Sequence, residues 1–312
     1  MNSVGSLVIS ARYAAGAVVD LDVRLERPEV ARLFIGQAPE TVVKTVPYLY
    51  TLCAQAQRAA AQAALAAACG EAPRPADSPA LWGEALHEHL WRLFLDWPAA
   101  LGLPPAKDAL VAWRNARHGD AGAAATAAAF TQLVGQPMDA WNGRPAFASL
   151  AGRCLERLGG IGECREFDLP PLTPENWLAY WQDKSAGEPA TMTPPSVADA
   201  YWVRLQEAVG AARALAAGRP YPVQASGGGG WGVGQTLTAR GVLTHGARVR
   251  LGRVIAYRVW APTDCHFARP DDVAALVAGR RPGDWQEARQ VLEQAVLALD
   301  PCLPYEVRMS HA

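Results

Sequence analysis

The sequence predicts a mainly α-helical protein with small β elements, an α+β fold. Apolar residues recur at helical spacing through most of residues 39–217, and they alternate as in strands only near residues 5–25 and 235–260. The 312 residues, half of them hydrophobic and only 19% charged, supply enough apolar material for one sizeable core. We therefore expect a single domain over residues 1–312, which ends in C-terminal helices and a tail over residues 270–312.

The charge balance and the apolar runs exclude several classes of protein. The chain has 29 Lys plus Arg against 30 Asp plus Glu, a net charge of −1, and no basic run on one predicted face. We therefore expect no nucleic-acid partner. The longest run of small apolar residues, 59–69, is too short to cross a bilayer, and residues 1–9 lack the positive segment of a signal peptide. These features favour a cytoplasmic protein without a membrane span.

The first half begins with a hairpin and continues as helices. Residues 5–25 contain two apolar runs around Ala15-Gly16, a pattern typical of a β-hairpin. A helical pattern then starts at residue 39 and ends at Cys69-Gly70, and Pro47 should kink or divide it just ahead of Cys53. The helical body continues to residue 217. Its further helical patterns in the first half cover residues 78–97, 106–118, 121–134 and 140–158.

The second half changes from helix to sheet and back to helix. Prolines dominate residues 170–195, which predicts a surface connection with a short helix around residues 177–181, before helical periodicity returns over residues 197–217. The glycine cluster at 227–234 lacks the Lys and Ser/Thr of a phosphate-binding loop, so we expect a tight loop that approaches another segment closely. The remaining predicted elements are strands over 235–240 and 247–259 with a turn at Gly252, and helices over 270–278 and 284–299.

Most residues with reactive side chains fit a structural role. A disulfide scaffold is improbable in a chain of this length without a secretion signal. His87 and His89 are two residues apart, so on a helix they point in different directions and cannot chelate one metal. Gly-x-Ser-x-Gly is absent, which leaves a hydrolase triad unsupported. The six cysteines contain no CxxC pair, and they stand at positions 53, 69, 154, 164, 265 and 302.

Four short segments carry a resemblance to a known family. Val46-Pro-Tyr-Leu-Tyr-Thr-Leu-Cys53 resembles the Val-Pro-Arg-x-Cys-Gly-x-Cys segment of nickel-iron hydrogenase large subunits, and Asp300-Pro-Cys302 resembles their Asp-Pro-Cys-x-x-Cys-x-x-His tail. Thr238-Ala-Arg-Gly-Val-Leu-Thr-His245 is similar to their Glu-Ala-Pro-Arg-Gly-x-Leu-x-His stretch, and Ala261-Pro-Thr263 to their x-Pro-Thr/Ser segment. In that family the two cysteine segments meet, and four thiolates hold nickel and an iron that carries cyanide and carbon monoxide. The resemblance implies a reduced large-subunit fold.

The chain departs from the family pattern at the metal ligands. Two of the four thiolate positions fall on Tyr50 and Tyr305, and a phenol is a hard and weakly acidic substitute for the soft ligands of nickel. The histidine of the family's N-terminal helix falls on Gln57, and the tail histidine falls on Arg308. We therefore expect no nickel.

The retained positions imply a site for iron alone. The resemblance implies that Cys53 and Cys302 hold one iron, that Arg240 and Thr263 donate hydrogen bonds to cyanide nitrogens, and that Leu243 and Pro262 line the apolar side. Such a copy of the large subunit resembles the hydrogenase expression/formation proteins of the HupK or HoxV kind.

That family implies a scaffold without enzyme activity. It would transiently hold the Fe(CN)2(CO) unit and pass it to the large-subunit precursor, with a HypC-like chaperone and HypD as further partners. Two alternatives remain: a metal-free structural paralogue that binds hydrogenase accessory proteins, and a small metalloenzyme with an altered two-cysteine centre. We also expect the tail over residues 301–312 to stay movable, so that the iron unit can leave.

Overall fold

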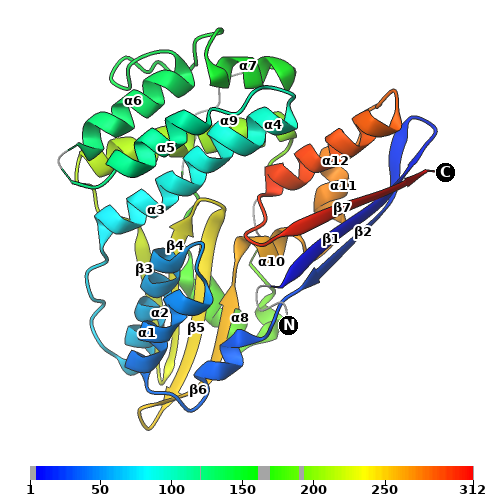
Figure 1. Ribbon diagram of the computed structural model, residues 1–312. Helices are drawn as coiled ribbons and strands as arrows, with labels where there is room; N and C mark the ends of the chain where they lie inside the picture. The colour runs from blue at the N-terminus through cyan, green and yellow to red at the C-terminus, as the bar shows by residue number, and fades with distance from the viewer. Residues whose placement is uncertain (1–4, 120, 161–168, 190–192, 312) are drawn as a thin grey trace.

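The computed structural model describes residues 5–119, 121–160, 169–189 and 193–311. It contains 49% helix and 19% strand, which confirms the predicted mixture of a helical body and small sheets. The helices gather in an upper layer and around a four-stranded sheet, while a second sheet extends to one side (Figure 1). Cys164, one of the six cysteines, lies outside the described residues.

The element bounds follow the predicted order of the chain. The strands are β1 Ser6–Ala14, β2 Ala17–Glu26, β3 Val223–Gly228, β4 Trp231–Thr238, β5 Gly241–Arg250, β6 Arg253–Trp260 and β7 Tyr305–His311. The α-helices are α1 Pro39–Leu49, α2 Ala54–Cys69, α3 Ser78–Trp91, α4 Trp97–Ala100, α5 Lys107–Ala116, α6 Gly122–Val134, α7 Leu150–Arg157, α8 Pro174–Gln182, α9 Val197–Ala216, α10 Pro262–His266, α11 Asp271–Val277 and α12 Trp285–Leu299. Short 3-10 turns cover η1 Val30–Phe34 and η3 Lys184–Ala186, and a π-helical turn, η2 Arg92–Asp96, joins α3 to α4.

Pro47 lies in the last turn of α1, which ends at Leu49. Cys53 then caps the start of α2, so the predicted division of the helical run ahead of this cysteine is confirmed. The predicted helix over residues 140–158 is too long, because only α7 forms and residues 140–149 are turns and bends. Asn142-Gly143 and Pro145 explain the break.

The glycine cluster is mostly strand, so the predicted tight loop is wrong. Strands β3 and β4 pair along the cluster, and only the residues between them turn. A Cβ on Gly232 would lie 2.1 Å from the carbonyl oxygen of Ala64, and one on Gly234 would lie 2.3 Å from that of Ala60. The predicted close approach is therefore confirmed, because strand residues without side chains let the alanine-rich helix α2 pack directly on the sheet.

The C-terminal tail is a strand rather than a loosely held segment. Strand β7 runs parallel to β1, with the register from Leu7 opposite Tyr305 to Tyr13 opposite His311, and the sheet order is β2-β1-β7. Val307 is buried on the face that packs against the main core. The pairing itself was not predicted because the partner strand lies at the other end of the chain, where no local pattern indicates it, and movement of the tail stays a prediction.

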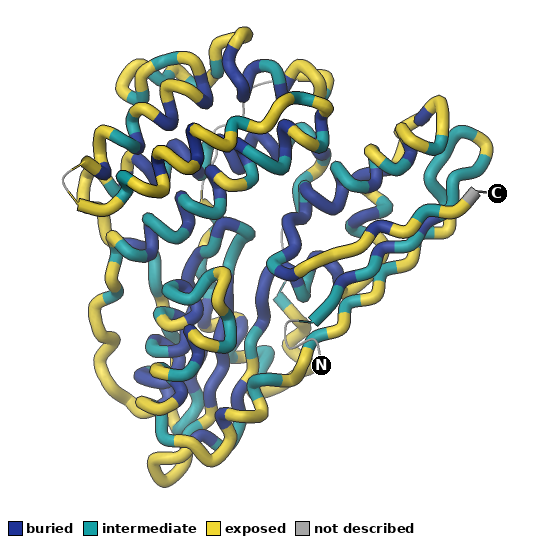
Figure 2. The backbone as a smooth tube through the Cα atoms, viewed as in Figure 1, coloured by how far each residue is buried: buried dark blue, intermediate teal, exposed yellow. Residues whose placement is uncertain are grey.

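The largest core cluster joins both sheets to the helical layer. It includes Leu7 and Ile9 of β1, Leu243 of β5, and many side chains of α3, α9 and α12. Figure 2 shows the buried residues concentrated where these parts meet, while the outer faces of the helices and of β7 are exposed. Within the described part of the chain, no helix is both long and apolar enough to cross a membrane.

Candidate two-cysteine site

Short connections from four parts of the chain meet at the predicted site. Cys53 lies between α1 and α2, Arg240 in the turn between β4 and β5, Thr263 in the first turn of α10, and Cys302 between α12 and β7. The backbone N–H of Cys302 donates to the hydroxyl oxygen of Thr263 over 3.1 Å, and Arg240 Nε donates to the carbonyl oxygen of Asp300 over 3.2 Å. The fold thus joins segments that are distant in the sequence.

The two cysteines lie within electrostatic reach of each other. Burial and then the negative charge of Cys302 raise the pKa of the Cys53 thiol to about 12, while the positive charge of Arg240 acts in the opposite direction. Both cysteines keep partial exposure and pack against the main core. Cys53 is therefore a protonated thiol at neutral pH in the metal-free protein.

A buried chain of hydrogen bonds fixes the surroundings of Cys53. Gln57 donates from Nε2 to Cys53 Sγ over 3.5 Å, and its Oε1 lies 2.8 Å from His245 Nε2. Because an amide oxygen only accepts, His245 carries its proton on Nε2, and its Nδ1 accepts from the Tyr257 hydroxyl over 2.7 Å. Burial lowers the pKa of His245 to about 3, so the ring stays neutral. In this arrangement the amide N–H of Gln57 points toward the sulfur.

Arg27 contacts Cys302 and was not found from the sequence. Its Nη2 donates to Cys302 Sγ over 3.0 Å, and its Nε lies 2.6 Å from Asp264 Oδ1. Asp264 follows Thr263 directly in α10. One helix turn therefore positions both Thr263, the expected hydrogen-bond donor to a cyanide, and Asp264, the ion-pair partner of Arg27. No motif includes Arg27, because it follows a hairpin strand far from either cysteine segment.

Asp300 is the centre of a buried charged network. Its side chain is 2% exposed, and its carboxylate lies 2.6 Å from Arg92 Nε, 2.7 Å from Arg204 Nη2 and 3.4 Å from Arg240 Nε. Burial by itself would raise the pKa of Asp300. The positive charges of Arg204, Arg240 and Arg92 outweigh this effect and hold the pKa well below its usual range. The network anchors the residue two positions before Cys302.

Arg240 keeps one donor unused. Its side chain is 3% exposed, Nη2 donates to Glu88 Oε2 over 2.7 Å, and Nε donates to Asp300. The buried Nη1 has no hydrogen-bond partner among the described residues. A buried guanidinium nitrogen without an acceptor is unfavourable by about 1–3 kcal/mol or more, so this atom favours an acceptor that the protein itself does not supply.

The two residues expected to line the apolar side lie in different places, Pro262 at the site and Leu243 in the core. Pro262 is buried beside the β4–β5 turn, 3.7 Å from the position of a Cβ on Gly241, and Leu243 is fully buried in the main core. Burial and the charges of Asp264, Cys53 and Cys302 raise the pKa of Tyr50 to about 12, although Arg27 lowers it, so this tyrosine belongs to the site.

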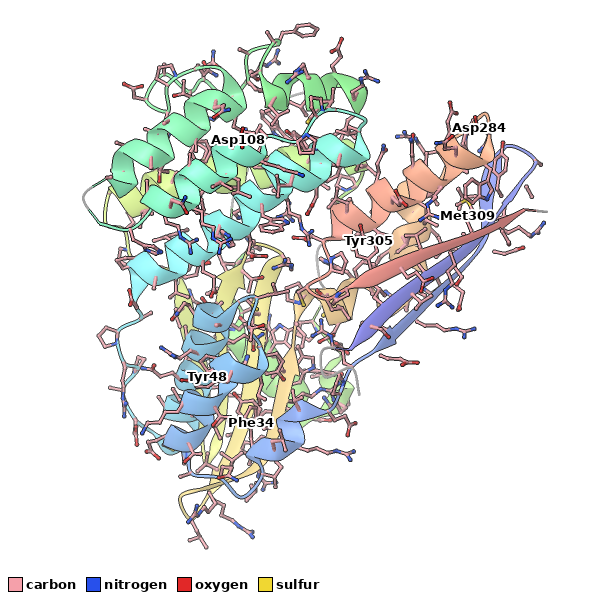
Figure 3. The ribbon with its side chains drawn as sticks, viewed as in Figure 1. Phe34, Tyr48, Asp108, Asp284, Tyr305 and Met309 are labelled. Carbon is pink, nitrogen blue, oxygen red and sulfur yellow. The ribbon has the colours of Figure 1, made fainter. Side chains whose placement is uncertain are left out.

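Tyr305, labelled in Figure 3, begins β7 and is 38% exposed. Burial raises its pKa, and the charges of Arg92, Glu293, Asp96 and Asp300 act on it most strongly. Tyr50 thus lies within electrostatic reach of both cysteines, and Tyr305 lies within reach of the charged network around Asp300.

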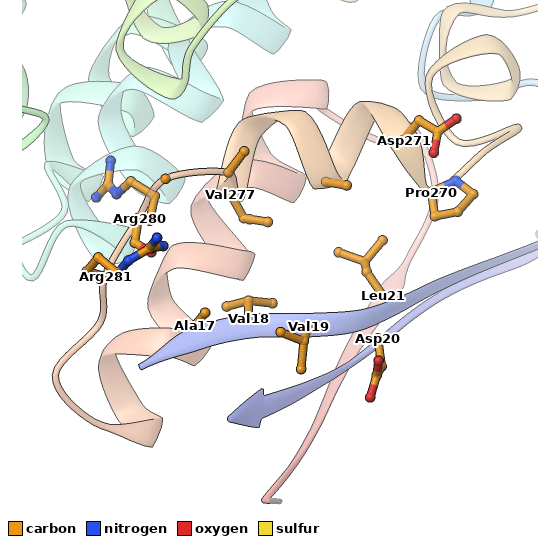
Figure 4. A pocket seen from close by; sticks show the side chains of 13 residues that line it. Ala17, Val18, Val19, Asp20, Leu21, Pro270, Asp271, Val277, Arg280 and Arg281 are labelled. Carbon is orange, nitrogen blue, oxygen red and sulfur yellow. The ribbon is translucent and has the colours of Figure 1, made fainter. Parts of the chain in front are cut away.

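No group of three or more His, Cys, Asp or Glu side chains within the described residues is placed to hold a metal ion. A groove with a volume of about 380 Å³ lies elsewhere, between β2 and α11 (Figure 4). Val18 and Leu21 line it on one side and Arg280 and Arg281 at one end. This groove contains none of the residues of the cysteine site.

Solved structures establish the class of fold. The chain resembles a Ni-Fe-Se hydrogenase from D. vulgaris Hildenborough with a TM-score of 0.61, 13% identity and coverage of 93% and 94% of the two chains. An NAD+-reducing nickel-iron hydrogenase gives a TM-score of 0.56 at 16% identity, with 92% and 93% covered. The protein therefore has the fold of nickel-iron hydrogenase large subunits, as predicted.

Curated relatives establish the family, although no family model matches the chain. The hydrogenase expression/formation protein HupK of Rhodobacter capsulatus is 30% identical over 91% of each chain, and HupK of Azotobacter vinelandii is 29% identical over 99% of each. HoxV of Cupriavidus necator is 27% identical over 92% of each chain. The chain belongs to the family of hydrogenase expression/formation proteins.

Proposed function

We propose that this protein is a scaffold for hydrogenase maturation that transiently holds the Fe(CN)2(CO) unit and passes it to the large-subunit precursor. The iron unit is cargo, and the protein acts by binding it rather than by catalysis. Family membership supports the role in hydrogenase formation. The residues around Cys53 and Cys302 support the identity of the cargo.

The unpartnered Nη1 of Arg240 is the observation that carries the proposal. A cyanide nitrogen is an anionic acceptor, and a buried guanidinium binds such an acceptor strongly. Arg240 also lies within electrostatic reach of both cysteines, since its pKa is raised by Cys302 and it lowers the pKa of Cys53. A cyanide on an iron held by the two cysteines would find this donor within the same site.

Thr263 offers a second donor for the same unit. Its hydroxyl oxygen accepts from the backbone N–H of Cys302, which leaves the hydroxyl proton free to be donated. Pro262, beside it, is buried and apolar, which suits a carbon monoxide ligand that forms no strong hydrogen bonds. The pair thus offers one polar and one apolar contact from the same helix turn.

Two thiolates are sufficient ligands for this cargo. An iron that brings three diatomic ligands of its own needs fewer protein ligands than a bare ion, and low-spin iron accepts soft thiolates. Because burial raises the pKa of Cys53 to about 12, iron binding must displace its proton. Proton return to Cys53 would in turn favour release, which is useful in a protein that gives up its cargo.

The partners that follow from this role are the hydrogenase large-subunit precursor, a HypC-like chaperone and HypD. A second candidate is a metal-free paralogue that binds only accessory proteins. The raised pKa of Cys53 favours this alternative, because a protonated thiol is a poor metal ligand. The experiment below separates the two.

The test is infrared spectroscopy with metal analysis on protein purified anaerobically from a hydrogenase-forming host. We expect cyanide and carbonyl bands with one iron and no nickel per chain, and no turnover of hydrogen with a dye. Cys53→Ala and Cys302→Ala should each lose bands and iron, whereas Cys69→Ala, at the exposed end of α2, should keep them.

Three results would contradict the proposal. Absence of the bands from the unmodified protein would favour the metal-free alternative. Equal iron in both cysteine variants and the unmodified protein would show that the cysteines are not ligands. Hydrogen turnover would favour the metalloenzyme.

A further inference from the structure

The guanidinium of Arg27 covers one side of the Cys302 sulfur. The distance from Nη2 to Sγ is 3.0 Å, within range of a hydrogen bond to sulfur. The side chain of Arg27 is 25% exposed, so the guanidinium is partly buried beside the sulfur. A metal species that binds this sulfur therefore has a permanent positive charge next to it.

Asp264 holds the guanidinium in this place. Its Oδ1 lies 2.6 Å from Arg27 Nε, and its side chain is only 34% exposed. If Arg27 moved away, the carboxylate would lose its cationic partner at a site where burial already raises its pKa. The arginine is therefore a fixed part of the site and not a surface side chain that moves freely.

A fixed cation at this distance distinguishes between two kinds of metal species. A bare divalent ion on Cys302 would lie within a few ångströms of the guanidinium, and like charges repel strongly where solvent is limited. An iron that already carries anionic cyanides has its charge largely offset by its own ligands. The same guanidinium offers such a complex a hydrogen-bond donor instead of repulsion.

We propose that Arg27 is a specificity-determining residue that restricts the two-cysteine site to a metal complex with anionic ligands and excludes bare divalent cations such as Ni²⁺. The identity of the complex rests on the proposed function, whereas the exclusion of bare cations rests on the contacts of Arg27 with Cys302 and Asp264 alone. Arg27 thus protects the two-cysteine site from occupation by the wrong metal.

The test is anaerobic equilibrium dialysis of the metal-free full chain against Ni²⁺, followed by metal analysis. Arg27→Gln keeps a hydrogen-bond donor and removes the charge, and it should bind Ni²⁺ at least tenfold more tightly than the unmodified protein. Arg27→Lys keeps the charge and should stay within about threefold of the unmodified protein. The double variant Arg27→Gln/Cys302→Ala should lose the gain, because the gain requires the sulfur.

Asp264→Asn controls for disturbance of the fold. It removes the partner that holds Arg27 but keeps the positive charge of Arg27, so Ni²⁺ affinity should rise less than in Arg27→Gln. Equal Ni²⁺ affinity in Arg27→Gln and the unmodified protein would overturn the proposal, as would an equal rise in Asp264→Asn. Circular dichroism on the same samples checks that each variant is folded.

The outcome is independent of the proposed function. Infrared spectra of the unmodified protein from a hydrogenase-forming host decide whether it holds the iron unit. If those bands are absent while Arg27→Gln gains tenfold in Ni²⁺ affinity, the scaffold proposal fails and the role of Arg27 stands. If the bands are present and Ni²⁺ affinity is unchanged, the scaffold proposal stands and the role of Arg27 fails.

Discussion

Asp300→Asn should destabilise the protein strongly without a change of shape. Asp300 has a left-handed backbone conformation with φ of 47°, which asparagine adopts as readily as aspartate. The substitution therefore isolates the loss of one negative charge. Arg204 is almost fully buried, and together with Arg92 and Arg240 it would be left without its central counter-charge.

The expected loss follows from the burial of this network. Removal of one partner from a buried ion pair typically costs about 3–5 kcal/mol, because the remaining charge stays desolvated. Glu306→Gln is the matched control, since its pair with Arg308 is 59% and 60% exposed and should contribute little to the free energy of unfolding. Urea unfolding with an unchanged slope measures both values.

The pH dependence adds a second check on Asp300. The pKa of Asp300 in the folded protein is lower than the ordinary value of about 3.9. The stabilisation by its charge is therefore present at a pH above that value and is lost as the pH falls below it. The unmodified protein and Asp300→Asn should therefore converge in stability in acid. A loss below about 1 kcal/mol at pH 7, or a difference that persists unchanged at low pH, would refute the reasoning.

Three further predictions concern the packing and the surroundings of Cys53. Gly232→Ala should destabilise the protein by about 1–3 kcal/mol or more, whereas Gly210→Ala, in α9 with open space around it, should stabilise by about 0.5–1 kcal/mol in urea unfolding. The pKa of His245 in the folded protein is lowered to about 3, so only the unfolded chain takes up a proton there between that pH and about 6.5. The unmodified protein should therefore lose stability relative to His245→Gln as the pH falls from about 6.5, by up to about 1.4 kcal/mol per pH unit. Parallel pH profiles of the two proteins would contradict this. Gln57→Leu should lower the iron content of protein from a hydrogenase-forming host, because the amide no longer donates to Cys53 Sγ, while Gln57→Asn should give an intermediate loss if reach to the sulfur matters.

The sequence by itself determined the local elements and the two cysteine segments. Helical spacing and the glycine stop predicted α2, and Pro47 predicted the break before Cys53, because these signals act within a few residues. The resemblance of short segments indicated that the region of Cys53 and that of Cys302 belong to one site. The roles of individual ligands stay predictions.

Only the tertiary structure decided how distant segments combine. The pairing of β7 with β1, the contact of Arg27 with Cys302, and the chain from Gln57 to His245 join residues separated by 188 or more positions. Hydrophobic periodicity records which face of an element is buried, but not against which other element it packs. Parallel strand pairing and buried hydrogen bonds depend on that choice, and it is made by the whole chain when the core closes.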